Sequence, residues 1–285
     1  MTLPPSLLRL AAFAAEPGGG NPAGVLLDAR NLDDGQMQDI ATEVGYAETA
    51  FLTEPAIDGD QRHARIKYFS PLAEVPFCGH ATIATAIALA TRDGVGTLRF
   101  ETAVGVIVIT TTLNEGAIIA SFTSVEPRLA DFSDGVLDRL LDLLGIGRGD
   151  LDPQYAPQVA FAGNWHPILV FANQTTFDTF QFDVEPMASL IEEQNWTGTV
   201  TTLFALAPNI FAARNLFPVG TILEDPATGS AAAALGGYLR ELALVDGPTR
   251  VLVHQGSHIG RPSLLTVDIP RTGGIIVSGS AITIT

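Results

Sequence analysis

The feature that most constrains this chain is a motif that occurs twice, 150 residues apart. Residues 74–84 read EVPFCGHATIA and residues 224–234 read EDPATGSAAAA, so Glu, Pro, Gly and two Ala hold the same places in both copies. In each copy a Pro and a Gly lead into small apolar residues, which is typical of a helix start. Because exposed N–H groups at a helix start bind anions, the repeat predicts two such sites, at Gly79 and Gly229.

The two helices that follow these starts are apolar on every side. Residues 82–90 read TIATAIALA and residues 231–239 read AAAALGGYL. A helix without a polar face must be buried all round. Strand-like patterns surround both segments. We therefore predict an α+β fold in which each half is a barrel-like, mostly antiparallel sheet wrapped around a central helix.

Further patterns predict the elements around these helices. Residues 104–112 and 117–122 form a hairpin pattern across the turn at 114–116. More strands are predicted at 250–255, 263–269 and 274–284, and helices at 33–44, 136–144 and 185–194. A Gly-Asn turn before an apolar strand occurs at 20–27 and again at 163–170. Since this repeat is far longer than a solenoid unit, it indicates a duplicated pair of domains.

Composition excludes several classes of protein. The chain has 15 basic and 31 acidic residues, a net charge of -16, which argues against binding to nucleic acid or to an anionic membrane. No uncharged apolar run is long enough to span a bilayer, and Arg9 interrupts the apolar N-terminal segment, which argues against a signal peptide. The single cysteine excludes a disulfide framework and fits a cytoplasmic location.

Mismatches between the two copies indicate where chemistry takes place. Cys78 faces Thr228 in the alignment, His80 faces Ser230, and Val75 faces Asp225. A cysteine at a helix start can have a lowered pKa, or it can be a small packing residue. An Asp before a Pro is also common as a helix N-cap, so a structural role for Asp225 stays open.

Taken together, the motifs resemble one known family. Residues 20–23, 69–82, 224–231 and 255–263 resemble, in this order, motifs of the PhzF-like (phenazine biosynthesis PhzF) family, from about residue 9 to the C-terminus. The resemblance implies a fold similar to that of diaminopimelate epimerase, with two pseudo-symmetric domains and the active site in a cleft between them. It implies domains of residues 1–124 plus 274–285 and of residues 125–273, and a homodimer.

The same resemblance implies the site residues. It places the catalytic groups on Glu48, His80, Asp225 and Ser230. Gly79 and Gly229, with Cys78 and Thr228 beside them, would bind the substrate. Epimerases of this fold use two cysteines, one from each half. Because Thr228 takes the second place here, a mechanism with two thiols is excluded.

The resulting functional hypothesis is a cofactor-independent isomerase of a small carboxylate. A well-known member of the family isomerises trans-2,3-dihydro-3-hydroxyanthranilate without a metal or an organic cofactor, so neither is expected here. Glu48 would remove a proton from one carbon and deliver a proton to another. An amino-acid-type epimerase or racemase and a non-catalytic small-molecule binding protein remain as alternatives. On its residues alone, Glu48 could also be an exposed carboxylate at a strand edge.

Two further histidine patterns are weak. His254 and His258 are four residues apart, but the Gly between them predicts a turn rather than a helical metal-binding pair. His166, next to Trp165, could line the cleft or cap a strand. No metal site is predicted from either pattern.

Overall fold

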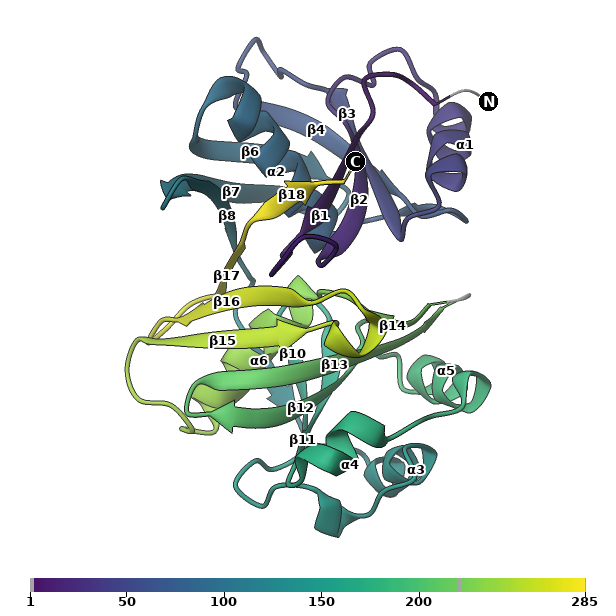
Figure 1. Cartoon of the computed structure of the whole chain (residues 1–285), viewed down its shortest axis with the longest axis vertical. Helices are drawn as coiled ribbons and strands as arrows, with labels where there is room; N and C mark the ends of the chain where they lie inside the picture. The colour runs from purple at the N-terminus through teal and green to yellow at the C-terminus, as the bar shows by residue number, and fades with distance from the viewer. Residues whose placement is uncertain (1–2, 220–221, 285) are drawn as a thin grey trace. The chain divides into compact units, whose positions relative to one another are not determined.

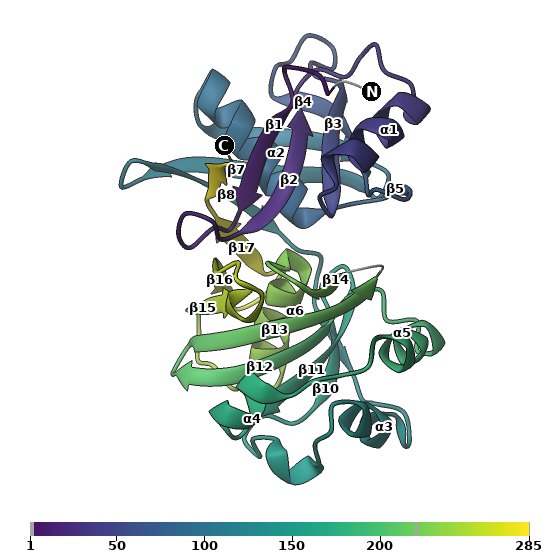
Figure 2. The same ribbon diagram turned by 45° about the vertical axis from the view of Figure 1, so that its right-hand side comes forward.

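The chain divides into two compact units in the computed structural model, which describes residues 3–219 and 222–284. The first unit is Met1–Thr123 with Ser278–Thr285, and the second is Ser124–Val277. Both units combine strands and helices, as Figures 1 and 2 show, so the predicted α+β class is confirmed.

The sheet of the first unit is mixed but mostly antiparallel. Its strands are β1 (Leu8–Ala12), β2 (Asn21–Leu26), β3 (Glu48–Glu54), β4 (His63–Phe69), β5 (Glu74–Val75), β6 (Gly96–Thr102), β7 (Gly105–Asn114), β8 (Ala117–Thr123) and β18 (Ala281–Thr283). They pair in the order β18-β1-β2-β3-β4-β6-β7-β8, with β5 added to β4. Only β2–β3 and β4–β6 are parallel among these pairs. β17 (Ile276–Gly279) spans the boundary of the two units.

Helix α2 (Gly79–Asp93) is the centre of the first unit. It contacts strands on both arms of the curled sheet, β1, β2 and β3 as well as β7, β8 and β18 (Figure 1). All of its residues from His80 to Ala90 are buried. Helix α1 (Asp34–Val44) instead lies on the outside of the sheet, against β3 and β4, and is capped by Asp33 and Gln36 in a capping box.

The second unit repeats this topology. Its strands are β9 (Arg128–Ala130), β10 (Gln158–Phe161), β11 (Trp165–Phe171), β12 (Val200–Ala207), β13 (Ile210–Val219), β14 (Ile222–Asp225), β15 (Thr249–Gln255) and β16 (Ser263–Ile269). Two parallel pairs, β11–β12 and β13–β15, again alternate with antiparallel ones, and β14 joins β13 as β5 joins β4. Helix α6 (Gly229–Glu241) takes the central place of α2.

Besides α6, the described residues of the second unit form three helices outside the sheet, where those of the first unit form only α1. They are α3 (Val136–Leu143), α4 (Gln174–Thr179) and α5 (Val184–Glu193), which pack outside the sheet over a core of leucine and aromatic side chains (Figure 2). Short 3-10 turns, η1 (Arg148–Asp150) and η2 (Ser257–Ile259), complete the unit. A buried ion pair joins β13 and β14, in which Arg214 Nη2 donates to Glu224 Oε1 at 2.6 Å. Nη1 of the same guanidinium donates to the carbonyl of Phe177 at 2.9 Å and so ties α4 to the sheet.

Most predicted elements lie where the pattern placed them. The helices predicted at 33–44, 136–144 and 185–194 are α1, α3 and α5. The predicted hairpin is β7–β8, and its turn residues Glu115 and Gly116 have φ of 50° and 85°, as a type I′ turn requires. Helix α4 was missed because a helix of six residues is too short to show a period.

Small residues in α6 allow its neighbours to approach the helix backbone. A Cβ added to Gly237 would lie 2.4 Å from Pro127 Cβ, and one added to Gly236 would lie 2.6 Å from a methyl carbon of Ile275. Both distances are far below van der Waals contact. The small-residue run is therefore a packing requirement of the second unit as well as a helix signal.

This close approach predicts that Gly237→Ala destabilises the protein. The gain in helix propensity, at most about 1 kcal/mol, is smaller than the cost of overpacking, about 1–3 kcal/mol. Urea unfolding should show a lower midpoint for Gly237→Ala than for the wild type. Gly149→Ala is the matched control, because an added Cβ meets nothing within 4 Å there. A midpoint for Gly237→Ala at or above that of the control would contradict the packing argument.

Candidate functional site

The start of α2 gathers three of the predicted site residues of the first unit. Cys78 is the N-cap residue, His80 is the second residue of the helix, and Glu48 begins β3. The thiol Sγ of Cys78 lies 3.4 Å from Glu48 Oε2, and His80 Nε2 lies 3.4 Å from the same oxygen. The side chain of Glu48 is 18% exposed, while that of His80 is only 7% exposed. A partly accessible carboxylate thus stands next to two buried polar groups.

Asn21, at the start of β2, fixes the ring of His80. Its Nδ2 lies 3.1 Å from His80 Nδ1. An amide nitrogen donates, so Asn21 can bond to Nδ1 of a neutral ring that carries its proton on Nε2, the nitrogen nearer to Glu48. Burial lowers the pKa of His80 to about 4, although the main chain of Pro22 acts in the opposite direction. His80 is therefore neutral at neutral pH and presents no positive charge to Glu48.

The start of α6 is braced by a different set of side chains. Thr228 is the N-cap residue, and its hydroxyl donates to Asp225 Oδ2 at 2.5 Å. Gln255, at the end of β15, accepts from the Thr228 main-chain N–H at 3.1 Å and donates to the Asp225 carbonyl at 2.6 Å. Asp225 is thus not the N-cap of the helix; its carboxylate instead accepts a bond from the residue that is.

Ser230 contacts a buried histidine, His166 of β11. His166 Nε2 lies 3.0 Å from Ser230 Oγ, and His166 Nδ1 lies within 3.1 Å of the N–H, the carbonyl and the hydroxyl of Thr199. The N–H of Thr199 can donate to Nδ1 and its carbonyl can accept from Nδ1, so either neutral tautomer of the ring has a partner on both nitrogens. In both cases the ring holds the Ser230 hydroxyl in place.

The two helix starts therefore have a similar arrangement, in which a histidine and its polar partner have exchanged places. In the first unit the second helical residue is a histidine, bonded to Asn21 of β2; in the second it is Ser230, bonded to the histidine of β11. The predicted first helical residues, Gly79 and Gly229, do begin α2 and α6. An added Cβ at Gly79 would lie 4.0 Å from a ring carbon of Phe77, an ordinary van der Waals contact.

Sequence reasoning missed three residues of these networks. Asn21 and Gln255 were noted only as parts of motifs, and His166 was left undecided. The Gly-Asn turn indicated the position of Asn21. The other two contacts are between residues distant in the sequence: His166 and Ser230 are 64 residues apart, and Gln255 and Thr228 are 27 residues apart. No local spacing reveals such pairs.

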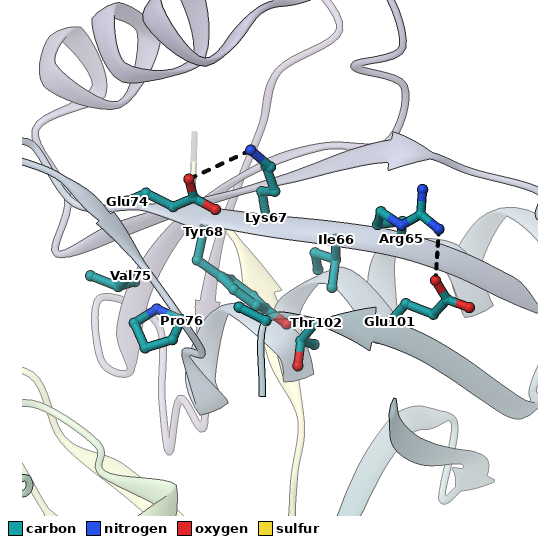
Figure 3. A pocket seen from close by; sticks show the side chains of 10 residues that line it. Arg65, Ile66, Lys67, Tyr68, Glu74, Val75, Pro76, Glu101 and Thr102 are labelled. Carbon is teal, nitrogen blue, oxygen red and sulfur yellow. Dashed lines mark hydrogen bonds and ion pairs between the residues drawn. The ribbon is translucent and has the colours of Figure 1, made fainter. Parts of the chain in front are cut away.

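A surface pocket of the first unit does not coincide with either helix start. It is lined by residues of β4, β5 and β6 and by the segments that follow β5 and β6 (Figure 3). The basic side chains at its rim are neutralised: Arg65 pairs with Glu101 at 2.9 Å and Lys67 with Glu74 at 3.5 Å. None of the predicted site residues lines this pocket, so it is not the candidate site.

The weak histidine pattern stays without a metal-like arrangement in the described residues. His258 lies in η2 and contacts Asp178 Oδ1 at 3.0 Å, whereas His254 is exposed on β15. Among residues 3–219 and 222–284, neither histidine belongs to a group of three possible metal ligands.

Comparisons with known proteins agree over nearly the whole chain. The model of the PhzC-PhzF family, described as phenazine biosynthesis-like protein, matches residues 10–285. The chain belongs to this family. A trans-2,3-dihydro-3-hydroxyanthranilate isomerase of Pseudomonas fluorescens is 32% identical over 255 residues, covering 89% of this chain and 86% of that protein. An uncharacterized isomerase of Deinococcus radiodurans is 33% identical over 275 residues, covering 93% and 87%.

Solved structures give the same fold. A PhzF-family protein of Bacillus anthracis aligns with a TM-score of 0.84 at 27% identity, covering 98% of this chain and 96% of that one. A probable proline racemase of Agrobacterium radiobacter aligns with a TM-score of 0.64 at 12% identity, covering 98% and 90%, which shows the fold alone. This PhzF-family chain is accordingly an isomerase with a diaminopimelate epimerase-like fold.

The predictions about membranes, assembly and location are separate from the family assignment. Within the described residues, no helix combines the length and the apolarity that crossing a bilayer requires. The homodimer, the cytoplasmic location, the domain boundaries and the cleft between the domains stay predictions from the sequence.

The buried state of His166 predicts a specific pH dependence of stability. Burial lowers its pKa from 6.5 to about 4, while the main chain of Thr199 opposes the shift. The unfolded chain therefore binds the proton more tightly, so this contribution is complete above pH 6.5 and is lost as the pH falls toward 4. At pH 5 the loss amounts to about 2 kcal/mol.

Urea unfolding at pH 7 and pH 5 measures this effect. The wild type should lose more unfolding free energy between these pH values than His166→Gln, and the difference should be about 2 kcal/mol. The control is His254→Gln, which replaces an exposed histidine and should keep the wild-type slope. Equal slopes in all three proteins would show that His166 is not held neutral by the fold.

Proposed function

We propose that this isomerase moves a proton between two carbons of a small carboxylate-bearing metabolite, with Glu48 as the acid and base. The observation that carries the proposal is the position of Glu48 Oε2, 3.4 Å from both Cys78 Sγ and His80 Nε2 at the start of α2. The cluster holds a partly exposed carboxylate in one orientation. A positioned carboxylate of this kind is suited to proton transfer with a bound substrate.

The chemistry requires only one such group. The Glu48 carboxylate removes a proton from a carbon that is activated by a neighbouring unsaturated or carboxylate group, and the electron pair moves along the conjugated system. The resulting carboxyl group then returns a proton to a different carbon, so the composition of the substrate is unchanged. No electron acceptor and no organic cofactor takes part in this sequence, in keeping with the expectation from the family resemblance.

A neutral His80 is compatible with both the charged and the protonated form of Glu48. With its proton on Nε2, a neutral His80 would donate to Glu48 and stabilise the carboxylate by about 1–3 kcal/mol, whereas a full positive charge would hold the carboxylate too strongly to accept a proton. His80 is neutral because burial lowers its pKa to about 4. We infer that Asn21 keeps this ring in place.

The start of α6 is proposed to bind the polar groups of the substrate. The N–H groups at Gly229 and the hydroxyl of Ser230, held by His166, suit a carboxylate. Asp225, held by Thr228, suits an amino or hydroxyl group. At the start of α2, Gly79 and Cys78 are proposed as further binding residues.

Proton shift along the substrate is favoured over inversion at one carbon. Inversion by two thiols needs a cysteine at each helix start, and the only cysteine of the chain is Cys78. The relative from Pseudomonas fluorescens, named as an isomerase of trans-2,3-dihydro-3-hydroxyanthranilate, also supports this choice. We propose a substrate of the same chemical class, a small unsaturated carboxylate.

Solvent exchange in D2O tests the proposal. Candidate carboxylates that bind the wild type are incubated in D2O and analysed by NMR; deuterium at a second carbon is the expected result. Glu48→Gln should lower the rate by about 10²- to 10⁴-fold, the usual contribution of a general acid or base. Glu74→Gln, which makes the same charge change at an exposed glutamate of β5, should exchange at the wild-type rate.

The other outcomes separate the alternatives. Deuterium confined to the original stereocentre would indicate an epimerase or racemase. Binding without any exchange would indicate a non-catalytic binding protein. Exchange that is as fast in Glu48→Gln as in the wild type would remove Glu48 from the mechanism.

A further inference from the structure

The cluster at the start of α2 has a second chemical property besides its acid and base chemistry. Its three donor side chains lie close together: Cys78 Sγ to Glu48 Oε2 is 3.4 Å, His80 Nε2 to Glu48 Oε2 is 3.4 Å, and Cys78 Sγ is 3.8 Å from His80 Nε2 and 3.3 Å from His80 Nδ1. Among residues 3–219 and 222–284, this is the single group of three His, Cys, Asp or Glu residues whose ligand atoms lie so close together.

The two distances from Glu48 Oε2 are close to those between ligand atoms of a tetrahedral zinc site. Zinc bonds are about 2.3 Å to a thiolate and about 2.0–2.1 Å to an imidazole or a carboxylate, and tetrahedral angles then separate the ligand atoms by about 3.3–3.6 Å. The two separations from Glu48 Oε2 fit these values, but the sulfur of Cys78 lies nearer to His80 Nδ1 than to Nε2. The Cys78 side chain must therefore rotate toward Nε2 before all three donors can bind one cation.

The chemistry of the donors selects the kind of cation. A thiolate and an imidazole favour zinc and similar transition metals, whereas magnesium and calcium require oxygen ligands. Two anionic ligands, Cys78 and Glu48, would balance the charge of a divalent cation. Since the side chain of Glu48 is 18% exposed, the cluster is not sealed from solvent.

We propose that a thiophilic divalent cation, of which Zn²⁺ fits best, binds Glu48, Cys78 and His80 and thereby inhibits the isomerase. The inhibition rests on the proposed function, because the cation occupies the carboxylate that acts as the base; the binding itself does not. On binding, the Cys78 thiol releases one proton to solvent and its sulfur forms the bond to the metal. No atom changes its oxidation state.

Asn21 adjusts the ring of His80 to the bound cation. With the metal on Nε2, the ring proton moves to Nδ1. The Asn21 amide, which lies 3.1 Å from Nδ1, then turns so that its oxygen accepts this proton. Such a bond to the second nitrogen is the usual support of a metal-binding histidine.

Cobalt is the probe of the binding step. Co²⁺ bound to a thiolate gives a charge-transfer absorption in the near ultraviolet, and Cys78 is the only cysteine of the chain, so the band reports this residue alone. Titration of the wild-type protein with Co²⁺ should develop the band at one equivalent, and Zn²⁺ should abolish it. Because the band is read on the wild type, the test does not depend on the folding of a variant.

Variants assign the other two ligands. His80→Gln and Glu48→Gln should each weaken Co²⁺ binding by at least 10-fold. His258→Gln is the control, since it removes a histidine of a two-donor surface pair with Asp178 and should leave binding unchanged. Circular dichroism checks that each variant is folded. Absence of the band, or equal affinity in His80→Gln, Glu48→Gln and the wild type, would overturn the site.

Inhibition is measured separately from binding. In the D2O exchange assay, one equivalent of Zn²⁺ should reduce the rate at least 10-fold, and EDTA should restore it. If exchange continues at the full rate while the cobalt band shows the site occupied, inhibition is overturned and binding stands. If exchange is absent in metal-free protein although the band forms, the proposed function fails with the inhibition, and the cation site stands.

Discussion

The burial of one apolar helix inside each curled sheet is the constraint on which the rest of this structure depends. Helices α2 and α6 offer their sheets small side chains, so strands and loops approach on nearly every side. Their N-terminal ends are held in place by the strands around them. The polar residues near these ends therefore stand on a rigid support, which acid and base chemistry requires because small displacements of the reacting groups slow a reaction.

The sequence repeat was sufficient to predict this support. A Pro and a Gly before a run of small residues is a local pattern, and both helices begin at the predicted glycines. The α+β class and the hairpin at Glu115 and Gly116 were equally readable, since turn residues and strand periods lie within a few positions. Cys78 and His80 were found in the same way, because both belong to the motif.

The hydrogen-bond networks around the helix starts were not predictable in this way. His166 meets Ser230 across 64 residues, and Asn21 meets His80 across 59 residues. Each pair depends on the register of strands that enclose the helix, which no spacing in a single sequence records. The repeat did show that His80 and Ser230 occupy equivalent positions. It did not show that the histidine of the second unit would instead be the partner of Ser230. The two helix starts thus share a backbone arrangement but differ in the polar side chains that surround them.

The path of the chain has a consequence for how the first unit is made. β18 pairs with β1, Leu10 opposite Thr283, and the whole second unit lies between them in the sequence. During synthesis, the neighbour of β1 on this side leaves the ribosome only after Ser124–Val277 has been made. Until then the edge of β1 is unsatisfied, and exposed strand edges pair with other chains. The first unit therefore completes its sheet only after nearly the whole chain has been made.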